Sequence, residues 1–181
     1  MESVVANRYA TALYGVARED GSERELFDEL EAVDVLMREN PELLKLLGAP
    51  TLPKAKRCEI LDRVFTGRIS ATLLNFLKIL AEKRRINHWQ GVVGEYRRLY
   101  YEQHNIAVAR VTTARPLSEE LESSIREKLS QTIGKQIVLE KKVDASILGG
   151  VVLDFDGERM DTSVRTQLGK IRKQILSNGI A

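Results

Sequence analysis

The sequence has 181 residues, of which 43% are hydrophobic and 30% are charged, and its formal net charge is +2. These values are ordinary for a soluble globular protein and argue against a disordered chain, while the small, mixed charge argues against a protein that mainly binds nucleic acid. No apolar run approaches the roughly 18 residues of a membrane-spanning helix, and the single cysteine, Cys58, excludes an internal disulfide.

Residues 3–20 form the first predicted helix. Apolar residues recur there at spacings of three and four, which is typical of one helix face: Val5, Tyr9, Ala12, Leu13 and Val16. The small residues of the same segment would let another helix approach closely: Ala6, Ala10 and Ala17.

Three more helices are predicted before residue 66. Ser22 and Glu25 form a capping box that predicts the start of the second helix, and Asn40-Pro41 predicts its end. Residues 42–48 form a short helix, and a proline-marked loop leads into another helix that ends at Phe65.

Ser70 then caps a helix over residues 71–85, whose apolar residues cover most of its circumference: Leu73, Leu74, Phe76, Leu77, Ile79 and Leu80. This helix is therefore either a central core helix or a docking surface. Residues 87–104 show a clear amphipathic repeat: Trp89, Val92, Val93, Tyr96, Leu99 and Tyr100. Six helices with short connections predict an antiparallel bundle of about 100 residues.

From Asn105 the apolar period changes to two, which is typical of strands. Residues 106–114 form the first predicted strand, and Ser118 caps a helix over residues 119–133. Gly134 ends that helix and releases a second strand over residues 135–143.

Asp156-Gly157 predicts a two-residue hairpin turn. Counting outward from this turn gives three expected cross-strand pairs: Phe155 with Glu158, Asp154 with Arg159, and Leu153 with Met160. Gly149-Gly150 permits a sharp bend before the hairpin, and Asp161 or Ser163 can cap a last helix.

The predicted fold class is therefore mainly α. An N-terminal six-helix antiparallel bundle, residues 1–105, is followed by a small α/β domain, residues 106–181, with the order strand, helix, strand, β-hairpin, helix. We expect the chain to divide between residues 104 and 116.

Signals of catalysis are poor. His88 and His104 have no Cys, Asp or Glu arranged around them at ligand spacing, and no nucleotide-binding or nucleophile-elbow motif is present. Asp154, Asp156 and Asp161 are each explained by pairing, turn or cap rather than by a bound cation. We expect no catalytic residue, no metal site and no cofactor.

Two other interpretations stay open beside a purely structural protein. An RNA-binding adaptor would use the C-terminal α/β module, the basic run EKRR at residues 82–85 and the GVVG sequence at residues 91–94, and its binding would weaken steeply with salt. Gly91 and Gly94 sit inside one helical repeat, however, where small residues usually serve close packing. A small enzyme would need a convergent polar pocket, which the sequence does not show.

The segment DASILGGVVLDFDGERMDTSVRTQLGKI, residues 144–171, resembles the C-terminal signature of the delta subunits of F-type ATP synthases, the counterparts of the mitochondrial oligomycin sensitivity-conferring protein. Residues 6–17 and 76–96 are similar to the opening helix and to the fifth and sixth helices of that family. One departure is Lys83-Arg84, where many members carry Asn-Gly or Lys-Gly.

The resemblance implies a non-catalytic stator subunit that stops the catalytic head from rotating with the rotor during proton-driven ATP synthesis. Its implied partners are the N-terminal helix of an alpha subunit, a beta subunit of the head, and the peripheral-stalk b subunits, with no nucleic acid and no direct membrane insertion. It would lie on the cytoplasmic side of a bacterial plasma membrane, or else on the mitochondrial matrix side or at a thylakoid; the start at Met1 favours a bacterium.

Two sets of contact residues follow from this resemblance together with the apolar patterns. The alpha subunit is expected between the first and fifth helices, at Tyr9, Ala12, Leu13, Val16, Leu73, Phe76, Leu77 and Leu80. The b subunits are expected at the glycine pair, the hairpin and the last helix: Gly149, Gly150, Val151, Asp161, Ser163, Leu168, Ile171 and Ile175.

Overall fold

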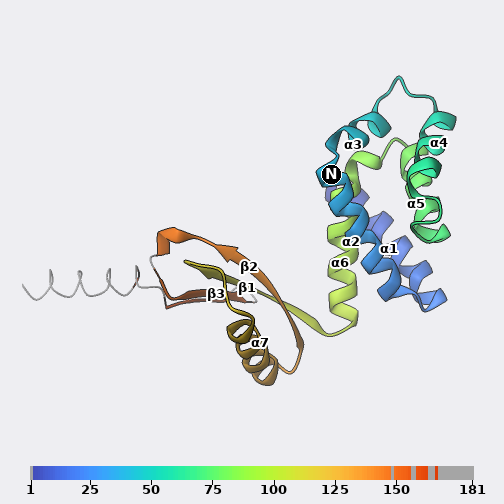
Figure 1. The fold of residues 1–181 in the computed structure, drawn as a ribbon. Coiled ribbons are helices and arrows are strands. Elements are labelled where there is room, and N and C mark those ends of the chain that lie inside the picture. Colours follow the sequence, from blue (N-terminus) through green and yellow to red (C-terminus); the bar gives the residue numbers. More distant parts are fainter. Residues whose placement is uncertain (1, 148, 156–157, 163–165, 167–181) are drawn as a thin grey trace, which may run out of the picture. The chain divides into compact units, whose positions relative to one another are not determined.

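The computed structural model describes residues 2–147, 149–155, 158–162 and 166 (Figure 1). The chain divides into two compact units, Met1–Gln103 and His104–Ala181. The described residues of the first unit are helical and those of the second contain a four-stranded sheet, so the fold is mainly helical with a small C-terminal sheet.

The described part of the first unit contains these helices: α1 (Glu2–Asp20), α2 (Glu23–Glu39), α3 (Pro41–Gly48), α4 (Lys54–Phe65), α5 (Ala71–Glu82), the short 3-10 helix η1 (Ile86–His88) and α6 (Trp89–Gln103). Both α1 and α2 pack against α6, and α4 packs against α5. Figure 1 shows these neighbours side by side. The core between them is anchored by Trp89 and Tyr96 of α6, both fully buried.

Small residues allow α1 to approach α6 closely. Ala6, Ala10 and Ala17 are all buried, and a Cβ atom added to Gly91 of α6 would lie 3.0 Å from the Cβ of Ala6. The predicted close approach is therefore confirmed where Gly91 faces Ala6. Gly94 has no such neighbour within 4 Å, so the packing role expected for it is wrong.

The capping box predicted for Ser22 and Glu25 is also wrong, because Ser22 makes no side-chain cap hydrogen bond to α2. Ser22 instead completes the end of α1: its N–H donates to the Ala17 carbonyl (2.8 Å), while Gly21 adopts a φ of +65°. This is a Schellman turn, in which the left-handed residue lets the chain reverse and satisfy the last carbonyls.

The end of α5 is a second Schellman turn, with an arginine at the position usually held by glycine. Arg84 adopts a φ of +57°, its N–H donates to the Ala81 carbonyl (3.2 Å), and the Arg85 N–H donates to the Leu80 carbonyl (2.8 Å). The turn expected from glycine in related sequences is thus formed here despite the arginine.

A buried arginine ties α4 to its neighbours. The Arg57 guanidinium donates to the Ala81 carbonyl at the end of α5 (2.9 Å) and to the Ala49 carbonyl after α3 (2.6 Å). Hydrogen bonds from a charged donor to helix-end carbonyls are stronger than neutral ones. At the N-terminal end of α5, the Glu29 carboxylate of α2 accepts hydrogen bonds from the N–H (2.8 Å) and the hydroxyl (2.6 Å) of Ser70. Both ends of α5 are therefore fixed.

The described part of the second unit contains β1 (Ile106–Thr113), α7 (Glu119–Ile133), β2 (Gln136–Val143), the 3-10 helix η2 (Ala145–Ile147), β3 (Val151–Phe155) and β4 (Glu158–Asp161). The strand order is β2-β1-β3-β4, with β1 and β2 parallel and the other pairs antiparallel. A parallel pair joined through a helix followed by an antiparallel hairpin matches the order of elements expected from the sequence.

Local signals in this unit are confirmed. The Ser118 hydroxyl accepts from the Leu121 N–H, and Gly134 adopts a φ of +72° at the end of α7. The hairpin register is the predicted one: Leu153 lies opposite Met160, Asp154 opposite Arg159, and Phe155 opposite Glu158. The turn at Asp156-Gly157 lies outside the described residues.

The two glycines of α6 give a matched test of the α1–α6 contact. We expect Gly94→Ala to raise the free energy of unfolding by about 1 kcal/mol, because alanine favours a helix and its Cβ meets open space. Gly91→Ala should raise the free energy of unfolding by distinctly less, because the Cβ of Ala6 must shift to make room. Gly91→Val should lower the free energy of unfolding by about 1–3 kcal/mol. Urea unfolding of the three variants measures this, and equal stabilisation by both alanines would contradict the packing described above.

Candidate functional site

The first unit exposes an apolar strip along α1. Val16 is 44% exposed and Ala12 is exposed, while Val5 and Tyr9 are half-buried. These four residues lie at spacings of three and four, so they share one side of the helix, next to the side that packs on α6. The apolar periodicity of α1 therefore marks a face that the rest of this unit leaves largely uncovered.

Helix α5 supplies the opposite wall of a groove. Ile79 is 47% exposed, and the rings of Tyr9 and Phe76 meet edge to face with centroids 6.3 Å apart. Between the two helices lies a cavity of about 400 Å³, lined by Val5, Arg8, Tyr9, Ala12, Ile79, Lys83 and Arg85. We call this cavity, together with the uncovered apolar face of α1 beside it, the α1–α5 groove.

The eight residues predicted to bind an alpha subunit divide between this groove and the core. Tyr9, Ala12 and Val16 belong to the uncovered face of α1, whereas five others are buried: Leu13, Leu73, Phe76, Leu77 and Leu80. Of these five, the ring of Phe76 meets that of Tyr9, and the other four belong to the buried core. The sequence interpretation missed Arg8, Lys83 and Arg85, since apolar periodicity does not mark basic residues.

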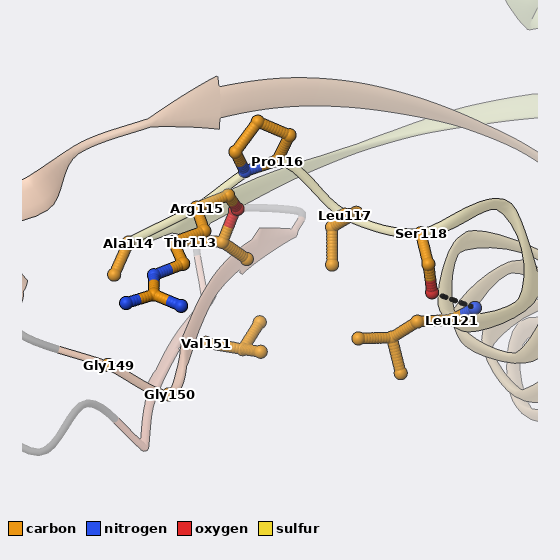
Figure 2. A pocket seen from close by; sticks show the side chains of 10 residues that line it. All are labelled: Thr113, Ala114, Arg115, Pro116, Leu117, Ser118, Leu121, Gly149, Gly150 and Val151. Carbon is orange, nitrogen blue, oxygen red and sulfur yellow. Dashed lines mark hydrogen bonds between the residues drawn. The ribbon is translucent and has the colours of Figure 1, made fainter.

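The second unit has a cavity of about 620 Å³ beside the glycine pair, lined by Thr113, Ala114, Arg115, Pro116, Leu117, Ser118, Leu121, Gly149, Gly150 and Val151. Figure 2 shows the side chains of Leu117, Leu121 and Val151 pointing toward one another, with the Pro116 loop and the glycine backbone on either side. Gly150 adopts a φ of +81°, a conformation that side chains disfavour. Three apolar side chains thus converge in an open cavity that the glycine backbone helps to form.

Apolar residues remain exposed around this cavity because α7 covers its sheet face only in part. No residue of α7 is fully buried, and Leu121 is 47% exposed. Lys141 binds Glu122 of α7 at 2.8 Å, so the sheet face that carries Lys141 is the one facing α7. Val143 and Met160, which the strand register places on that same face, are 54% and 64% exposed.

An electrostatic contact holds α7 in this position. The Glu122 carboxylate accepts from Lys141 and from Arg126 (2.7 Å), and the hydrogen bond from Lys141 is the main reason why the pKa of Glu122 lies below its usual value. The ionised Glu122 therefore links α7 to β2 through an exposed ion pair.

The residues predicted to bind b subunits have different outcomes. Gly149, Gly150 and Val151 line the cavity, and Asp161 ends β4, where its carboxylate accepts from the Thr166 hydroxyl at 2.9 Å. Four others lie outside the described residues: Ser163, Leu168, Ile171 and Ile175. The sequence interpretation missed Pro116 and Leu117, which join the glycine pair only in the folded unit.

The described residues contain no cluster of three or more His, Cys, Asp and Glu side chains suited to a metal ion. Within the same residues, none of the helices combines the length and the apolar character needed to cross a bilayer. Burial, and secondarily Glu82, raises the pKa of the Cys58 thiol, whose Sγ lies 3.8 Å from the Glu82 carboxylate. A thiol held in its protonated form is a poor nucleophile.

The family model and the related proteins match this chain over nearly its whole length. The family model described as ATP synthase delta (OSCP) subunit matches residues 5–175. The ATP synthase subunit delta of Clostridioides difficile is 32% identical over 176 residues, which cover 97% of each chain. That of Nitrobacter winogradskyi is 35% identical over 178 residues, covering 98% of this chain and 96% of the other.

A solved structure shares the fold. A chain in the cryo-EM structure of the Toxoplasma gondii mitochondrial ATP synthase hexamer matches with a TM-score of 0.67 and 22% identity, covering 94% of this chain and 97% of that one. At this level of identity the likeness concerns the fold alone.

Proposed function

The chain belongs to the ATP synthase delta (OSCP) family, and from this premise we propose that it links the catalytic head of an F-type ATP synthase to the peripheral stalk. Members of this family are non-catalytic stator components of the synthase, peripheral to the membrane. The proposal concerns how this chain makes the link: one docking surface on each unit, and no chemistry of its own.

The first unit receives the N-terminal helix of an alpha subunit in the α1–α5 groove. The observation that carries this proposal is the division of α1 into a small-residue face packed on α6 and an apolar face left uncovered. Exposed apolar residues aligned on one helix favour a helical partner, because its own stripe can cover them. The six helices act as one antiparallel bundle that presents this groove to the head, where a beta subunit also lies.

The second unit grips the b subunits at the cavity beside Gly149-Gly150. Leu121 lines that cavity, and Val143 and Met160 are exposed on the same sheet face, which favours an apolar partner over a charged one. The last helix, with Leu168, Ile171 and Ile175, completes this surface in our proposal. We place the whole assembly at the cytoplasmic side of a bacterial plasma membrane.

Apolar docking suits a stator. A contact that resists rotor torque must outlast many turnovers, and slow dissociation comes from well-packed buried surface rather than from exposed ion pairs. At about 25 cal/mol per Å² of apolar area, each surface needs to bury some hundreds of Å² to supply roughly 10 kcal/mol before the costs of ordering.

The groove proposal predicts the behaviour of Ala12→Asp. Ala12 is exposed, so the variant should fold normally, but docking a helix over it would bury a carboxylate in an apolar seam. We expect affinity for an alpha-subunit N-terminal peptide to fall by about 2 kcal/mol or more, roughly 30-fold. Isothermal titration calorimetry with the full-length chain measures this.

Ala32→Asp is the matched control, because Ala32 is also an exposed alanine on a helix, α2, and does not line the groove. This control should bind the peptide as the wild type does. Equal affinity of the Ala12→Asp variant and the wild type would place the alpha-subunit contact elsewhere.

The stalk proposal predicts that Gly150→Asp leaves the first unit folded and able to bind the alpha peptide, but weakens binding of the b subunits. A side chain at a φ of +81° costs roughly 1 kcal/mol and changes the wall of the cavity. Leu121→Asp tests the same surface without backbone strain, and Ser123→Asp on the exposed side of α7 is its control. Pull-down of b subunits beside circular dichroism measures both; folded Leu121→Asp protein that captures b normally would contradict the proposal.

A further inference from the structure

We propose that the α1–α5 groove is built for an acidic amphipathic helix, because three cations at its wall, Arg8, Lys83 and Arg85, pair with a carboxylate of the helix that docks there. This inference rests on the proposed function, in which the docking helix is the N-terminal segment of an alpha subunit. It adds the charge that this segment must carry and the position of that charge along the groove.

The three cations come from two separate parts of the chain. Arg8 lies in the first half of α1, whereas Lys83 and Arg85 flank the turn that ends α5. All three are exposed and line the same cavity, whose other walls are apolar or aromatic. Positive charge therefore borders an otherwise apolar seat.

The first unit provides no counter-charge for this cluster among its described side chains. No described carboxylate lies within 4.0 Å of any of the three cations. Glu82, the sequence neighbour of Lys83, instead pairs with Lys54 of α4 at 3.0 Å. Lys78, one turn earlier in α5, also has its own partner, Asp62 at 2.7 Å.

Helical neighbours do not supply an anion for Arg8 either. The residues three and four positions away in α1 are Val4, Val5, Thr11 and Ala12, all uncharged. An ion pair of the common i,i+4 type is therefore impossible within the helix. A lysine or arginine near the C-terminus of a helix interacts favourably with the negative end of the helix dipole. That explanation covers Lys83 and Arg85 but not Arg8, which lies on another helix.

The turn after α5 holds its two cations in a fixed frame. The hydrogen bonds from Arg84 to the Ala81 carbonyl and from Arg85 to the Leu80 carbonyl fix the backbone on both sides of Arg84. A fixed backbone lowers the entropy lost when an anion is bound, so the cluster is partly pre-organised.

The groove also sets the size of the partner. Val5 and Val16, at the two ends of the uncovered face, are separated by eleven residues of helix, about 16 Å or three turns. A partner helix of at least three turns with apolar residues at spacings of three and four covers this face. Its carboxylate lies at the Arg8 end, where it speeds association more than it slows dissociation.

The test uses the full-length chain and a synthetic peptide of about 25 residues from the N-terminus of the alpha subunit of the same organism. Binding kinetics are measured at about 50 and about 300 mM NaCl for the wild type and for the triple variant Arg8→Gln, Lys83→Gln, Arg85→Gln. We expect the triple variant to bind about 10-fold more weakly at low salt, mostly through slower association, and the difference to shrink at high salt.

The matched control is Arg24→Gln, Lys45→Gln, Lys128→Gln, which removes the same net charge at exposed positions on α2, α3 and α7. This control should bind with nearly wild-type kinetics. Reversing the charges supports the inference further if the variant Lys83→Glu, Arg85→Glu regains affinity for a peptide whose acidic residues are replaced by lysine.

The outcomes separate this inference from the function on which it rests. If the wild type binds the peptide and the triple variant binds equally well, the inference is overturned and the groove proposal stands. If the wild type does not bind the peptide at all, both are overturned. If only binding to phosphatidylglycerol vesicles is lost in the triple variant, the cluster is a lipid-headgroup site and the inference is again overturned.

Discussion

The close contact between α1 and α6 determines what the rest of the first unit can do. Three buried alanines of α1 and Gly91 of α6 bring the two helices together on the small-residue side of α1. Since a helix has limited circumference, packing this side leaves the apolar side of Val5, Tyr9, Ala12 and Val16 for something else. The groove is a consequence of this choice of face, and the alpha-subunit helix that we propose to dock there would cover the apolar residues that the chain itself leaves exposed.

Both units follow the same physical logic. Each has a buried apolar core and leaves one apolar surface open, between α1 and α5 in the first and around Leu121 and the glycine pair in the second. Polar contacts connect the elements that carry each surface: Arg57 and Glu29 bind the two ends of α5, and Glu122 links α7 to β2. A subunit with no chemistry of its own can resist force if its docking surfaces stand on rigid elements, which is what these contacts provide.

Local signals in the sequence predicted local structure well, because they depend on few residues. The caps at Ser70 and Ser118 and the register around Leu153 and Met160 follow from hydrogen bonds and turn geometry within a short segment. The Ser22 capping box failed because a competing motif at the end of α1 used the same residue.

The sequence was a poorer guide to tertiary packing, that is, to which helix faces are buried and which distant residues come together. Apolar periodicity cannot tell a core face from a docking face, so Leu73, Leu77 and Leu80 were assigned to a surface although they are buried. Charged groups from distant segments, such as Arg8 and Arg85, line one cavity only in the folded unit.

The most direct test of the central claim is methyl NMR of the full-length chain titrated with the alpha-subunit peptide. We expect the methyl signals of Ala12, Val16 and Ile79 to shift while those of Ala6, Ala10 and Ala17 stay in place. Shifts confined to the three buried alanines, with Ala12 and Ile79 unchanged, would contradict the division of α1 into a packed face and a docking face.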